Sequence, residues 1–292
     1  MTTGFLVVDK PGGITSNAVV TRVKKATGTK KVGHAGTLDP LATGAVVIAI
    51  GPVTRLIRFI QEQPKEYFAT AEFGVATDTL DADGAVLSRE PMEVSVEDLE
   101  SVRPRFMGSI HQVPPMVSAL KHKGRRLYEL AREGVVVERE AREVRIDELE
   151  FLSAGPGPYP EVSFRVVCGK GTYVRTLADD IAATLGGAAH LTALRRTRIG
   201  SLDVDTHGIP ADDLEGWESK LISPHEALRD LASIQVNDET ARAVRHGVRF
   251  VGGEMVSLPE GEPVRVIDDE GDLLAVYSRT GDISRAEVVL SQ

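Results

Sequence analysis

The segment from Gly33 to Gly44 constrains the folding of this chain most strongly, because it concentrates three glycines, one histidine and one carboxylate in twelve residues. Glycine lets a main chain turn sharply and approach a ligand closely. Pro40 disfavours helical geometry at the residue before it, so Asp39 is held at a stiff, extended corner. The apolar, β-branched run at residues 45–50 predicts a buried strand. The segment is therefore a loop that enters a buried strand, with Asp39 as its candidate functional group.

The dipeptide Asp39-Pro40 supports two interpretations. An aspartate followed by proline is typical of a short turn in which the carboxylate caps the first amide groups. The same carboxylate, five residues after His34 and surrounded by glycines, also suits chemistry on a ligand. The dipeptide alone favours capping, so the role of Asp39 depends on what the fold brings next to it.

Periodicity and the placement of glycine and proline predict alternating strands and helices. A strand at residues 5–9 precedes a helix that Thr15 or Ser16 caps and Gly28 ends. Further strands are expected at residues 45–50, 65–74, 144–152, 162–168 and 190–202, and helices at residues 52–62, 94–103 and 172–185. Residues 218–231 are typical of a helix and connector. The remaining 234–292 have the length of a small β-rich module, so we expect two domains, 1–233 and 234–292.

The composition narrows the classes of function. The 292 residues are 42% apolar and 26% charged, an ordinary balance for a folded protein. No apolar run reaches the roughly 20 residues that span a bilayer, and residues 1–10 lack the pattern of a secretory signal. The single cysteine, Cys168, excludes an internal disulfide and a cysteine-ligated metal cluster. We therefore expect a cytoplasmic protein with no membrane partner and no zinc or iron–sulfur centre.

The net charge of −9 is spread unevenly along the chain. Residues 201–292 hold 8 basic and 19 acidic residues, so the first 200 residues hold 26 and 24. Three basic clusters in this first part could neutralise RNA phosphates: residues 10–31, which contain no carboxylate; Lys121, Lys123, Arg125 and Arg126; and Arg195, Arg196 and Arg198. Basic runs are also common on ordinary solvated surfaces, so charge alone leaves RNA binding open.

The complete string Gly-His-Ala-Gly-Thr-Leu-Asp-Pro-Leu-Ala-Thr-Gly at residues 33–44 closely resembles the catalytic motif of the TruB family of tRNA pseudouridine synthases. Other segments agree in order and spacing: Lys10–Ser16, Lys65–Tyr67, Thr77–Gly84, Gln112–Lys121, and Lys170–Arg175 followed by Leu194–Arg196. The resemblance spans about residues 4–200. It implies a pseudouridine synthase fold of class α+β, with a mixed, mostly antiparallel sheet crossed by the active cleft. It also implies a small β-rich C-terminal PUA-like domain that binds RNA.

The reaction that the resemblance implies is the isomerisation of a T-loop uridine, uridine 55 of tRNA, without cofactor or metal. The bond from uracil N1 to ribose C1′ breaks, the base turns and rejoins through C5, and the C5 proton leaves. Extruding the base from the stacked loop costs on the order of a few kcal/mol. A carboxylate can add to the sugar, add to the base, or take the ribose C2′ proton, and the sequence leaves these routes open. Each begins from the ionised carboxylate, which a neighbouring guanidinium favours.

The resemblance also assigns roles to individual residues. Asp39 is the catalytic carboxylate, Arg175 pairs with it, and Tyr67 lies against the flipped base and assists removal of the C5 proton. The implied substrate-binding residues are His34, which fills the place that the base leaves, Tyr173 and Leu194 in the base pocket, Gly33 and Gly36 in the motif, and Lys10. Lys10, with Thr15 and Ser16, can contact the RNA backbone or brace the fold. Asp81 and Asp83 are interpreted as part of a turn, with no metal.

Two questions remain open at this stage. Arg242, Arg245 and Arg249 are spaced 3 and 4 apart, so on a helix they would form one stripe that touches phosphate or pairs with nearby acids. The main expectation is a stand-alone, monomeric enzyme acting on the T-stem-loop. The alternatives are an RNA-guided synthase of the dyskerin kind, against which residues 121–130 count because they resemble the stand-alone enzymes, and a tRNA-binding folding chaperone.

Overall fold

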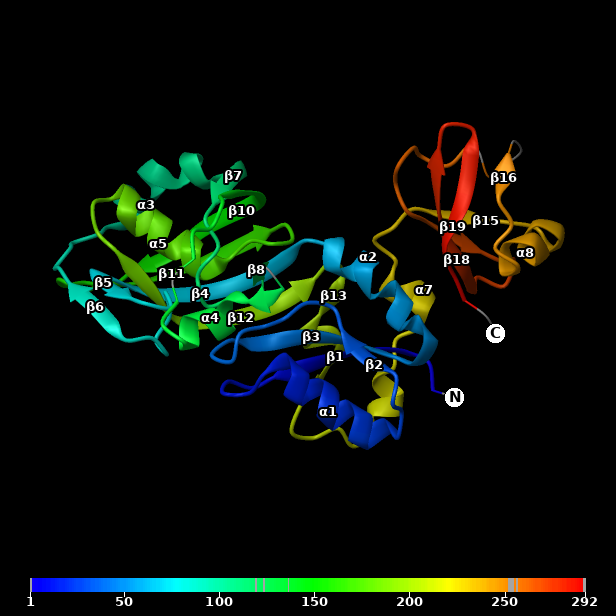
Figure 1. The fold of residues 1–292 in the computed structure, drawn as a ribbon, viewed down its shortest axis with the longest axis horizontal. Coiled ribbons are helices and arrows are strands. Elements are labelled where there is room, and N and C mark those ends of the chain that lie inside the picture. The colour runs from blue at the N-terminus through cyan, green and yellow to red at the C-terminus, as the bar shows by residue number, and fades with distance from the viewer. Residues whose placement is uncertain are drawn as a thin grey trace.

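The computed structural model describes residues 2–290 except Ala119, Lys123, Val136, residues 252–254 and Val256. Ten of the described strands form one twisted sheet, seen along the middle of Figure 1. Eight follow one another in the order β14 (Gly208–Pro210), β1 (Gly4–Lys10), β3 (Thr43–Ile50), β12 (Ala189–Ile199), β4 (Lys65–Phe73), β11 (Glu161–Cys168), β10 (Arg142–Ala154) and β7 (Gly108–Gln112), while β2 (Val32–His34) pairs with β3 and β13 (Leu202–Asp203) with β12. Only the β1–β14 and β3–β12 pairs are parallel, so the predicted mixed, mostly antiparallel sheet is confirmed.

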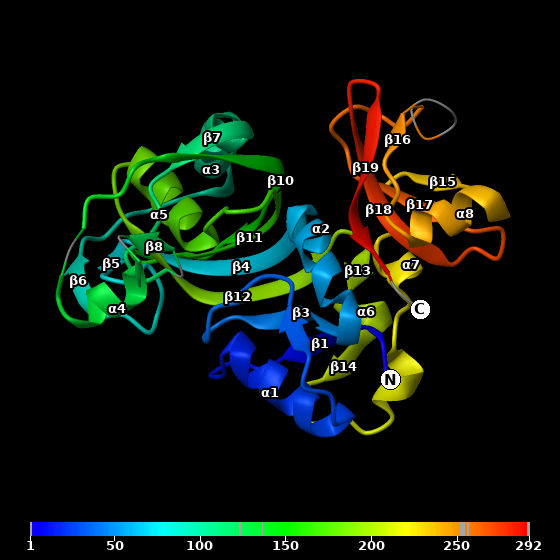
Figure 2. The same ribbon diagram turned by 45° about the vertical axis from the view of Figure 1, so that its right-hand side comes forward.

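Helices cover both faces of this sheet (Figures 1 and 2). Those packed on the first face are α1 (Ser16–Thr27), α3 (Val96–Val102) and α5 (Val174–Thr184), and those near the second are η1 (Gly51–Leu56), α2 (Ile57–Glu62), α6 (Val204–His207) and α7 (Pro224–Ala227). Smaller elements are η2 (Arg103–Phe106), η3 (Trp217–Lys220), α4 (Leu127–Arg132) and the strand pairs β5 (Val75–Thr77) with β6 (Val86–Arg89) and β8 (Lys121–His122) with β9 (Arg125–Arg126). Among the described residues, no helix is long and apolar enough to cross a membrane.

The first elements show why the sequence folds in this way. In β1, Leu6 and Val8 enter the core under α1, α3 and α5, while Phe5 and Val7 enter the core on the other face. A strand buried on both sides is therefore apolar throughout, as the sequence indicates. Helix α1 begins where Thr15 accepts a hydrogen bond from the amide of Ala18, and it ends at left-handed Gly28, so both predicted caps are confirmed.

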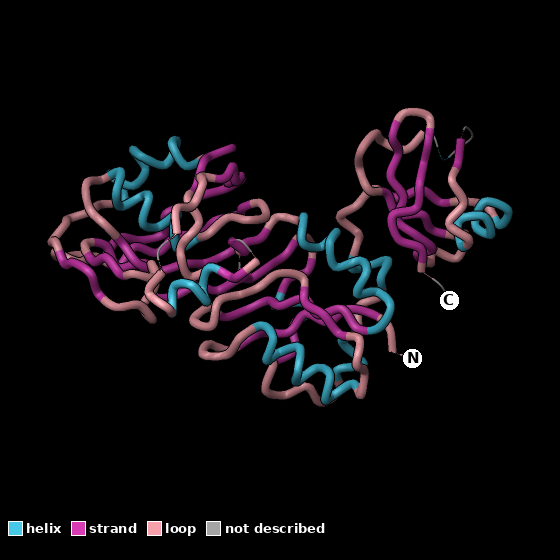
Figure 3. Tube along the Cα trace, in the orientation of Figure 1, coloured by secondary structure: helices cyan, strands magenta, loops and turns pink. Residues whose placement is uncertain are grey.

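The C-terminal part forms a separate five-stranded sheet, visible at the right of Figure 1 and as the second group of strands in Figure 3. Its order is β15 (Ser233–Gln235), β17 (Val264–Ile267), β18 (Leu273–Thr280), β19 (Ile283–Val289) and β16 (Phe250–Val251), with α8 (Asp238–Arg245) packed on it. The expected β-rich module is thus present. It also packs against η1 and α2, because Val276 and Val288 share a core with Leu56 and Phe59. We keep a domain boundary near residue 233 as a proposal.

Three arginines of this module, Arg242, Arg245 and Arg249, do not lie on one helix. Helix α8 ends at Arg245, so Arg249 lies beyond it. The guanidinium of Arg245 contacts Asp268 at 2.9 Å, and Nε of Arg242 donates to the Asp238 carbonyl. The sequence left two roles open for these arginines, contact with phosphate and pairing with nearby acids. Arg245 pairs with an acid.

Candidate active site

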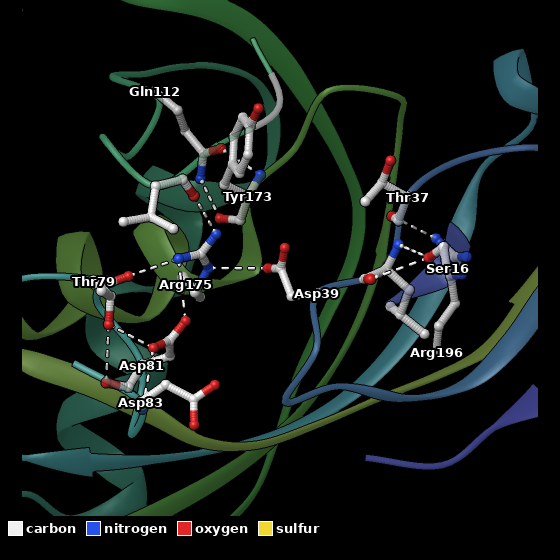
Figure 4. Close-up of polar contacts among 12 residues, drawn as sticks. Ser16, Thr37, Asp39, Thr79, Asp81, Asp83, Gln112, Tyr173, Arg175 and Arg196 are labelled. Atoms are coloured by element: carbon white, nitrogen blue, oxygen red, sulfur yellow. Dashed lines mark hydrogen bonds and ion pairs between the residues drawn. The ribbon is translucent and has the colours of Figure 1, made fainter. Parts of the chain in front are cut away.

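Asp39 lies in the loop between β2 and β3. Its main-chain carbonyl accepts a hydrogen bond from the amide of Ala42 at 3.1 Å, with Pro40 inside the turn. The main chain of Asp39, and not its carboxylate, closes this turn. The turn therefore forms without the carboxylate acting as a cap. The side chain of Asp39 is 38% exposed and points toward Arg175 (Figure 4).

Two polar side chains from the start of the chain hold the residues on either side of Asp39. The Ser16 hydroxyl accepts from the amide of Leu38 at 2.8 Å and donates to its carbonyl at 3.1 Å. The Lys10 ammonium and the Gly13 amide both donate to the carbonyl of Pro40, at 3.1 and 2.8 Å. The backbone of Asp39 is therefore fixed from both sides, which is the preorganisation that a catalytic carboxylate requires.

Lys10 is fully buried, and its ammonium also donates to the carbonyls of Pro11 and Ile14, at 2.9 Å each. Burial lowers its pKa to about 8, with the charge of Asp39 opposing the change. Three donors meeting three carbonyls leave none for a phosphate. Lys10 was expected in the substrate-binding set, but the structure gives it the other role considered for it, bracing the fold.

Arg175 lies in the first turn of α5 and is 3% exposed. Its Nε atom lies 3.1 Å from Oδ2 of Asp39, so the structure brings together the two residues that the sequence pairs. Its Nη1 atom donates to Oδ2 of Asp81 at 3.1 Å and to the Thr79 carbonyl at 2.7 Å, and Nη2 donates to the Val117 carbonyl at 2.8 Å. These contacts fix the plane of the guanidinium against the carboxylate of Asp39 (Figure 4).

Asp81 is a site residue that sequence reasoning missed. It was interpreted as part of a turn, but its carboxylate is buried and accepts hydrogen bonds from Arg175, Thr79 and the amide of Asp83. Arg175 therefore lies between two carboxylates, one buried and one partly exposed. The sequence feature that could have identified Asp81 is the match of residues 77–84 to the family pattern.

The two tyrosines lie close enough to Asp39 to respond to its charge. Burial raises the pKa of Tyr67 on β4, and the charge of Asp39 adds to the rise while that of Arg196 opposes it. Burial also raises the pKa of Tyr173, again with a contribution from Asp39. The main chain of Tyr173, at the start of α5, is held by Gln112, whose amide oxygen accepts from the Tyr173 amide at 3.1 Å (Figure 4). Both phenols remain protonated at neutral pH.

Leu194 and Tyr67 share one face of the sheet. In the antiparallel pairing of β12 with β4, Leu194 is opposite Ala69 and Arg196 is opposite Tyr67. Residues two apart on a strand point to the same face, so Leu194, Arg196 and Tyr67 lie together. Both Leu194 and Tyr67 belong to the core cluster beneath α5, which places the predicted apolar and aromatic residues on the side of the sheet that carries Asp39 and Arg175.

The remaining residues of the motif have structural reasons of their own. A Cβ at Gly33 would lie 2.9 Å from the Ile57 side chain, and Gly36 has φ +108, which disfavours any other residue. Burial lowers the pKa of His34, so its imidazole is neutral at pH 7. Within the described part of the chain, its buried Nδ1 has no hydrogen-bond partner. The backbone of Gly36 lies near the imidazole and opposes the fall in its pKa.

Of the three basic clusters, the third is engaged largely within the protein. Arg195 pairs with Asp9 at 2.9 Å, Arg198 pairs with Glu66 at 3.1 Å, and Arg196 is buried. In the first cluster, the solvent-exposed lysines are Lys24, Lys25, Lys30 and Lys31. In the second, Arg125 pairs with Glu133, Lys123 lies outside the described residues, and the side chains of Lys121 and Arg126 are not described.

The chain is similar in sequence to proteins of one family. The family model described as "TruB family pseudouridylate synthase (N terminal domain)" matches residues 24–174, and "tRNA pseudouridylate synthase B C-terminal domain" matches residues 175–232. Proteins named tRNA pseudouridine synthase B are 43% identical in Moorella thermoacetica and 42% identical in Ralstonia nicotianae. These alignments cover 94% and 97% of this chain, and 93% of each relative.

Solved structures support the same fold. The crystal structure of a Cbf5-Nop10-Gar1 complex contains a chain that is 27% identical, with a TM-score of 0.75, over 98% of this chain and 84% of that one. A structure of an H/ACA RNP bound to a substrate RNA containing 2′-deoxyuridine gives 26% identity and a TM-score of 0.74, over 99% and 85% of the two chains. With family models matched from residue 24 to residue 232 and relatives above 40% identity along nearly the whole length, the chain belongs to the TruB family of pseudouridylate synthases and is an isomerase.

Proposed function

We propose that the chain converts uridine 55 in the T-loop of tRNA to pseudouridine, with Asp39 as the catalytic carboxylate. The observation that carries the proposal is the contact between Asp39 and Arg175 at 3.1 Å, in a site that Tyr67 and Tyr173 also border. The names of the relatives, tRNA pseudouridine synthase B, support tRNA as the substrate class.

The geometry suits each of the three routes for the reaction. Arg175 stabilises the ionised form of Asp39, which then adds to the sugar, adds to the base, or takes the C2′ proton. In every route the N1–C1′ bond breaks, a C5–C1′ bond forms, C5 loses its proton and N1 gains one. Asp39 is only partly exposed, so a base that enters the site displaces water around the carboxylate and strengthens its electrostatic interactions.

We propose that the uridine reaches Asp39 by leaving the stacked T-loop. The aromatic face of Tyr67 supports the flipped base, and Tyr173 and Leu194 border it. His34 takes the place of the base in the loop, which agrees with its neutral imidazole. No cofactor takes part.

A direct test is to map pseudouridine in tRNA transcribed without modifications, before and after incubation with the purified protein. We expect one new pseudouridine, at position 55, and none in a transcript in which that uridine is replaced by cytidine. Modification at another position would refute the T-loop assignment, and absence of pseudouridine in every tRNA would refute tRNA as the substrate.

An RNA-guided function is the second candidate, because the similar solved chains come from a Cbf5-Nop10-Gar1 complex and an H/ACA RNP. We favour the stand-alone enzyme. The relatives named tRNA pseudouridine synthase B are about 15 percentage points more identical to this chain than the chain of the Cbf5-Nop10-Gar1 complex is. Activity on a bare T-stem-loop transcript distinguishes the two, because a guided enzyme requires an added guide RNA.

A folding-chaperone role would be separated from catalysis by an Asp39→Asn variant that still accelerates tRNA refolding.

For the rest of the chain, we propose that residues 234–292 form a PUA-like domain that contacts the same tRNA. The protein then acts as a cytoplasmic monomer, with residues 1–233 carrying the catalytic site. The compact five-stranded sheet and its packing against η1 and α2 support a fixed position for this domain beside the catalytic part.

A further inference from the structure

Arg196 has the largest fully buried side chain among the described residues. Burial of a guanidinium is unfavourable unless its charge and its N–H groups are satisfied. Its neighbour Arg195 pairs with Asp9 and Arg198 pairs with Glu66, but Arg196 forms no ion pair within the described part of the chain. The fold therefore retains a buried charge without a carboxylate partner, next to the candidate active site.

The contacts of Arg196 are main-chain carbonyls of the Asp39 loop. Its Nε atom donates to the carbonyl of Ala45 at 2.8 Å, Nη2 to that of Gly36 at 3.3 Å, and Nη1 to that of Thr37 at 3.4 Å. Gly36 and Thr37 precede Asp39 by three and two residues, and Ala45 lies in β3, where the loop ends. One guanidinium thus joins both ends of the loop, as the right side of Figure 4 shows for Thr37.

Arg196 also faces Tyr67. The two residues are opposite one another in the pairing of β12 with β4 and share one face of the sheet. The positive charge of Arg196 opposes the rise that burial causes in the pKa of Tyr67, and it adds to the fall that burial causes in the pKa of His34. Both effects place the guanidinium among the groups that surround Asp39.

We propose that Arg196 is a positioning residue for the reaction, which fixes the main chain leading to Asp39 relative to the ring of Tyr67. This inference rests on the proposed function, because it concerns the same site. It differs from phosphate binding, the role that its sequence neighbourhood indicated. A lysine cannot replace it, since one ammonium lacks the planar fork that reaches Gly36, Thr37 and Ala45 together.

The test compares wild type, Arg196→Lys, Arg196→Met and the matched control Arg195→Lys on a T-stem-loop transcript. Single-turnover rates with saturating enzyme report the chemical step, filter binding reports RNA affinity, and thermal unfolding reports the fold. We expect Arg196→Lys and Arg196→Met to lower the rate about tenfold or more, with the RNA Kd changed by less than about twofold. Arg195→Lys keeps its ion pair at the surface and is expected to stay within about twofold of wild type in rate.

The proposal is overturned if Arg196→Lys reacts at the wild-type rate, or if it loses RNA affinity while the rate of the bound complex is unchanged. Loss of cooperative thermal unfolding in Arg196→Lys would also overturn it, by showing a role in folding alone. A wild-type protein that forms no pseudouridine on any T-stem-loop would instead refute the proposed function itself.

Discussion

The Nε atom of Arg175 lies 3.1 Å from Oδ2 of Asp39, while Nη1 of the same guanidinium lies 3.1 Å from Oδ2 of Asp81. The two carboxylates differ in exposure, at 38% for the side chain of Asp39 and 8% for that of Asp81. Asp81 holds the arginine from inside the protein, and Asp39 meets it where solvent reaches the carboxylate. In the proposed function, one arginine therefore serves Asp81 as a structural partner and Asp39 as a chemical partner.

Replacing Arg175 should slow the reaction more than it weakens RNA binding. Arg175→Lys keeps the charge but cannot contact Asp39, Asp81 and two carbonyls with one ammonium, so we expect kcat to fall by about 100-fold. The measurement is steady-state kinetics on unmodified tRNA. Arg165→Lys, which alters an ion-paired arginine on another part of the sheet, is the matched control. Equal losses in the two variants would contradict the special position of Arg175.

Removing the buried carboxylate should destabilise the fold. Asp81→Ala leaves part of the buried Arg175 guanidinium unpaired, so we expect the free energy of unfolding to fall by about 3 kcal/mol. Urea unfolding followed by circular dichroism measures it. Asp83→Ala removes an exposed carboxylate from the same turn and should change stability by less than about 0.5 kcal/mol. A similar loss in both variants would show that the turn itself, and not the contact with Arg175, is responsible.

Activity should depend on pH through Lys10. Its pKa is about 8 because burial disfavours its charged form. Deprotonation removes one of the three donors that hold the carbonyls of Pro11, Ile14 and Pro40, so we expect turnover to fall as pH rises through about 8. Lys10→Arg should abolish this decline, because a guanidinium does not titrate in that range. Lys65→Arg is the matched control, since Lys65 is also buried with a pKa of about 8 but donates to Gln61 and Gln63.

The pKa of Lys10 predicts the opposite pH dependence for the free energy of unfolding. Its folded pKa of about 8 lies below its ordinary value of 10.5, so between these pH values the unfolded chain binds more protons than the folded one. The Lys10 contribution to the free energy of unfolding therefore rises with pH across this window. The fall in turnover above pH 8 should occur without a loss of stability from Lys10. If Lys10→Arg removed the activity decline only by preventing unfolding, this account of the loop would be wrong.

The exposed lysines at the end of α1 should contribute to RNA affinity. Lys24 and Lys25 are exposed in a segment without carboxylates, so we expect Lys24→Glu combined with Lys25→Glu to weaken tRNA binding by about tenfold and to reduce its salt dependence. Turnover of the bound complex should not change. The control is Lys220→Glu, which alters an exposed lysine in η3, within the acidic stretch at residues 201–292. An equal loss of affinity there would indicate a nonspecific effect of net charge.

The sequence predicts local features of the fold correctly where a single residue determines the local geometry. Thr15 as a cap, Gly28 as a helix end and the apolar strand after residue 44 depend on short-range rules, and the structure confirms them. Arg242, Arg245 and Arg249 do not share one helix, because α8 ends before Gly247, whose φ of +69 is typical of a residue just beyond a helix. Spacing by 3 and 4 shows which residues would share a face, but it does not show where the helix ends.

The candidate site could be predicted only in part. The resemblance indicated that Asp39 and Arg175 pair, and they are in contact. Arg196 and Asp81 were not identified, because the burial of a charged group depends on carbonyls and partners that distant segments supply. Arg196 stands between two arginines that pair at the surface, and nothing in the local sequence distinguishes it from them.

The most direct test of the central claim is pseudouridine formation by Asp39→Asn on an unmodified tRNA, measured with the affinity of the variant for the same RNA. The amide has nearly the shape of the carboxylate but cannot act as nucleophile or base. We predict that pseudouridine at position 55 becomes undetectable while the Kd stays within about twofold of wild type. Undiminished turnover by Asp39→Asn would contradict the assignment of Asp39 as the catalytic carboxylate.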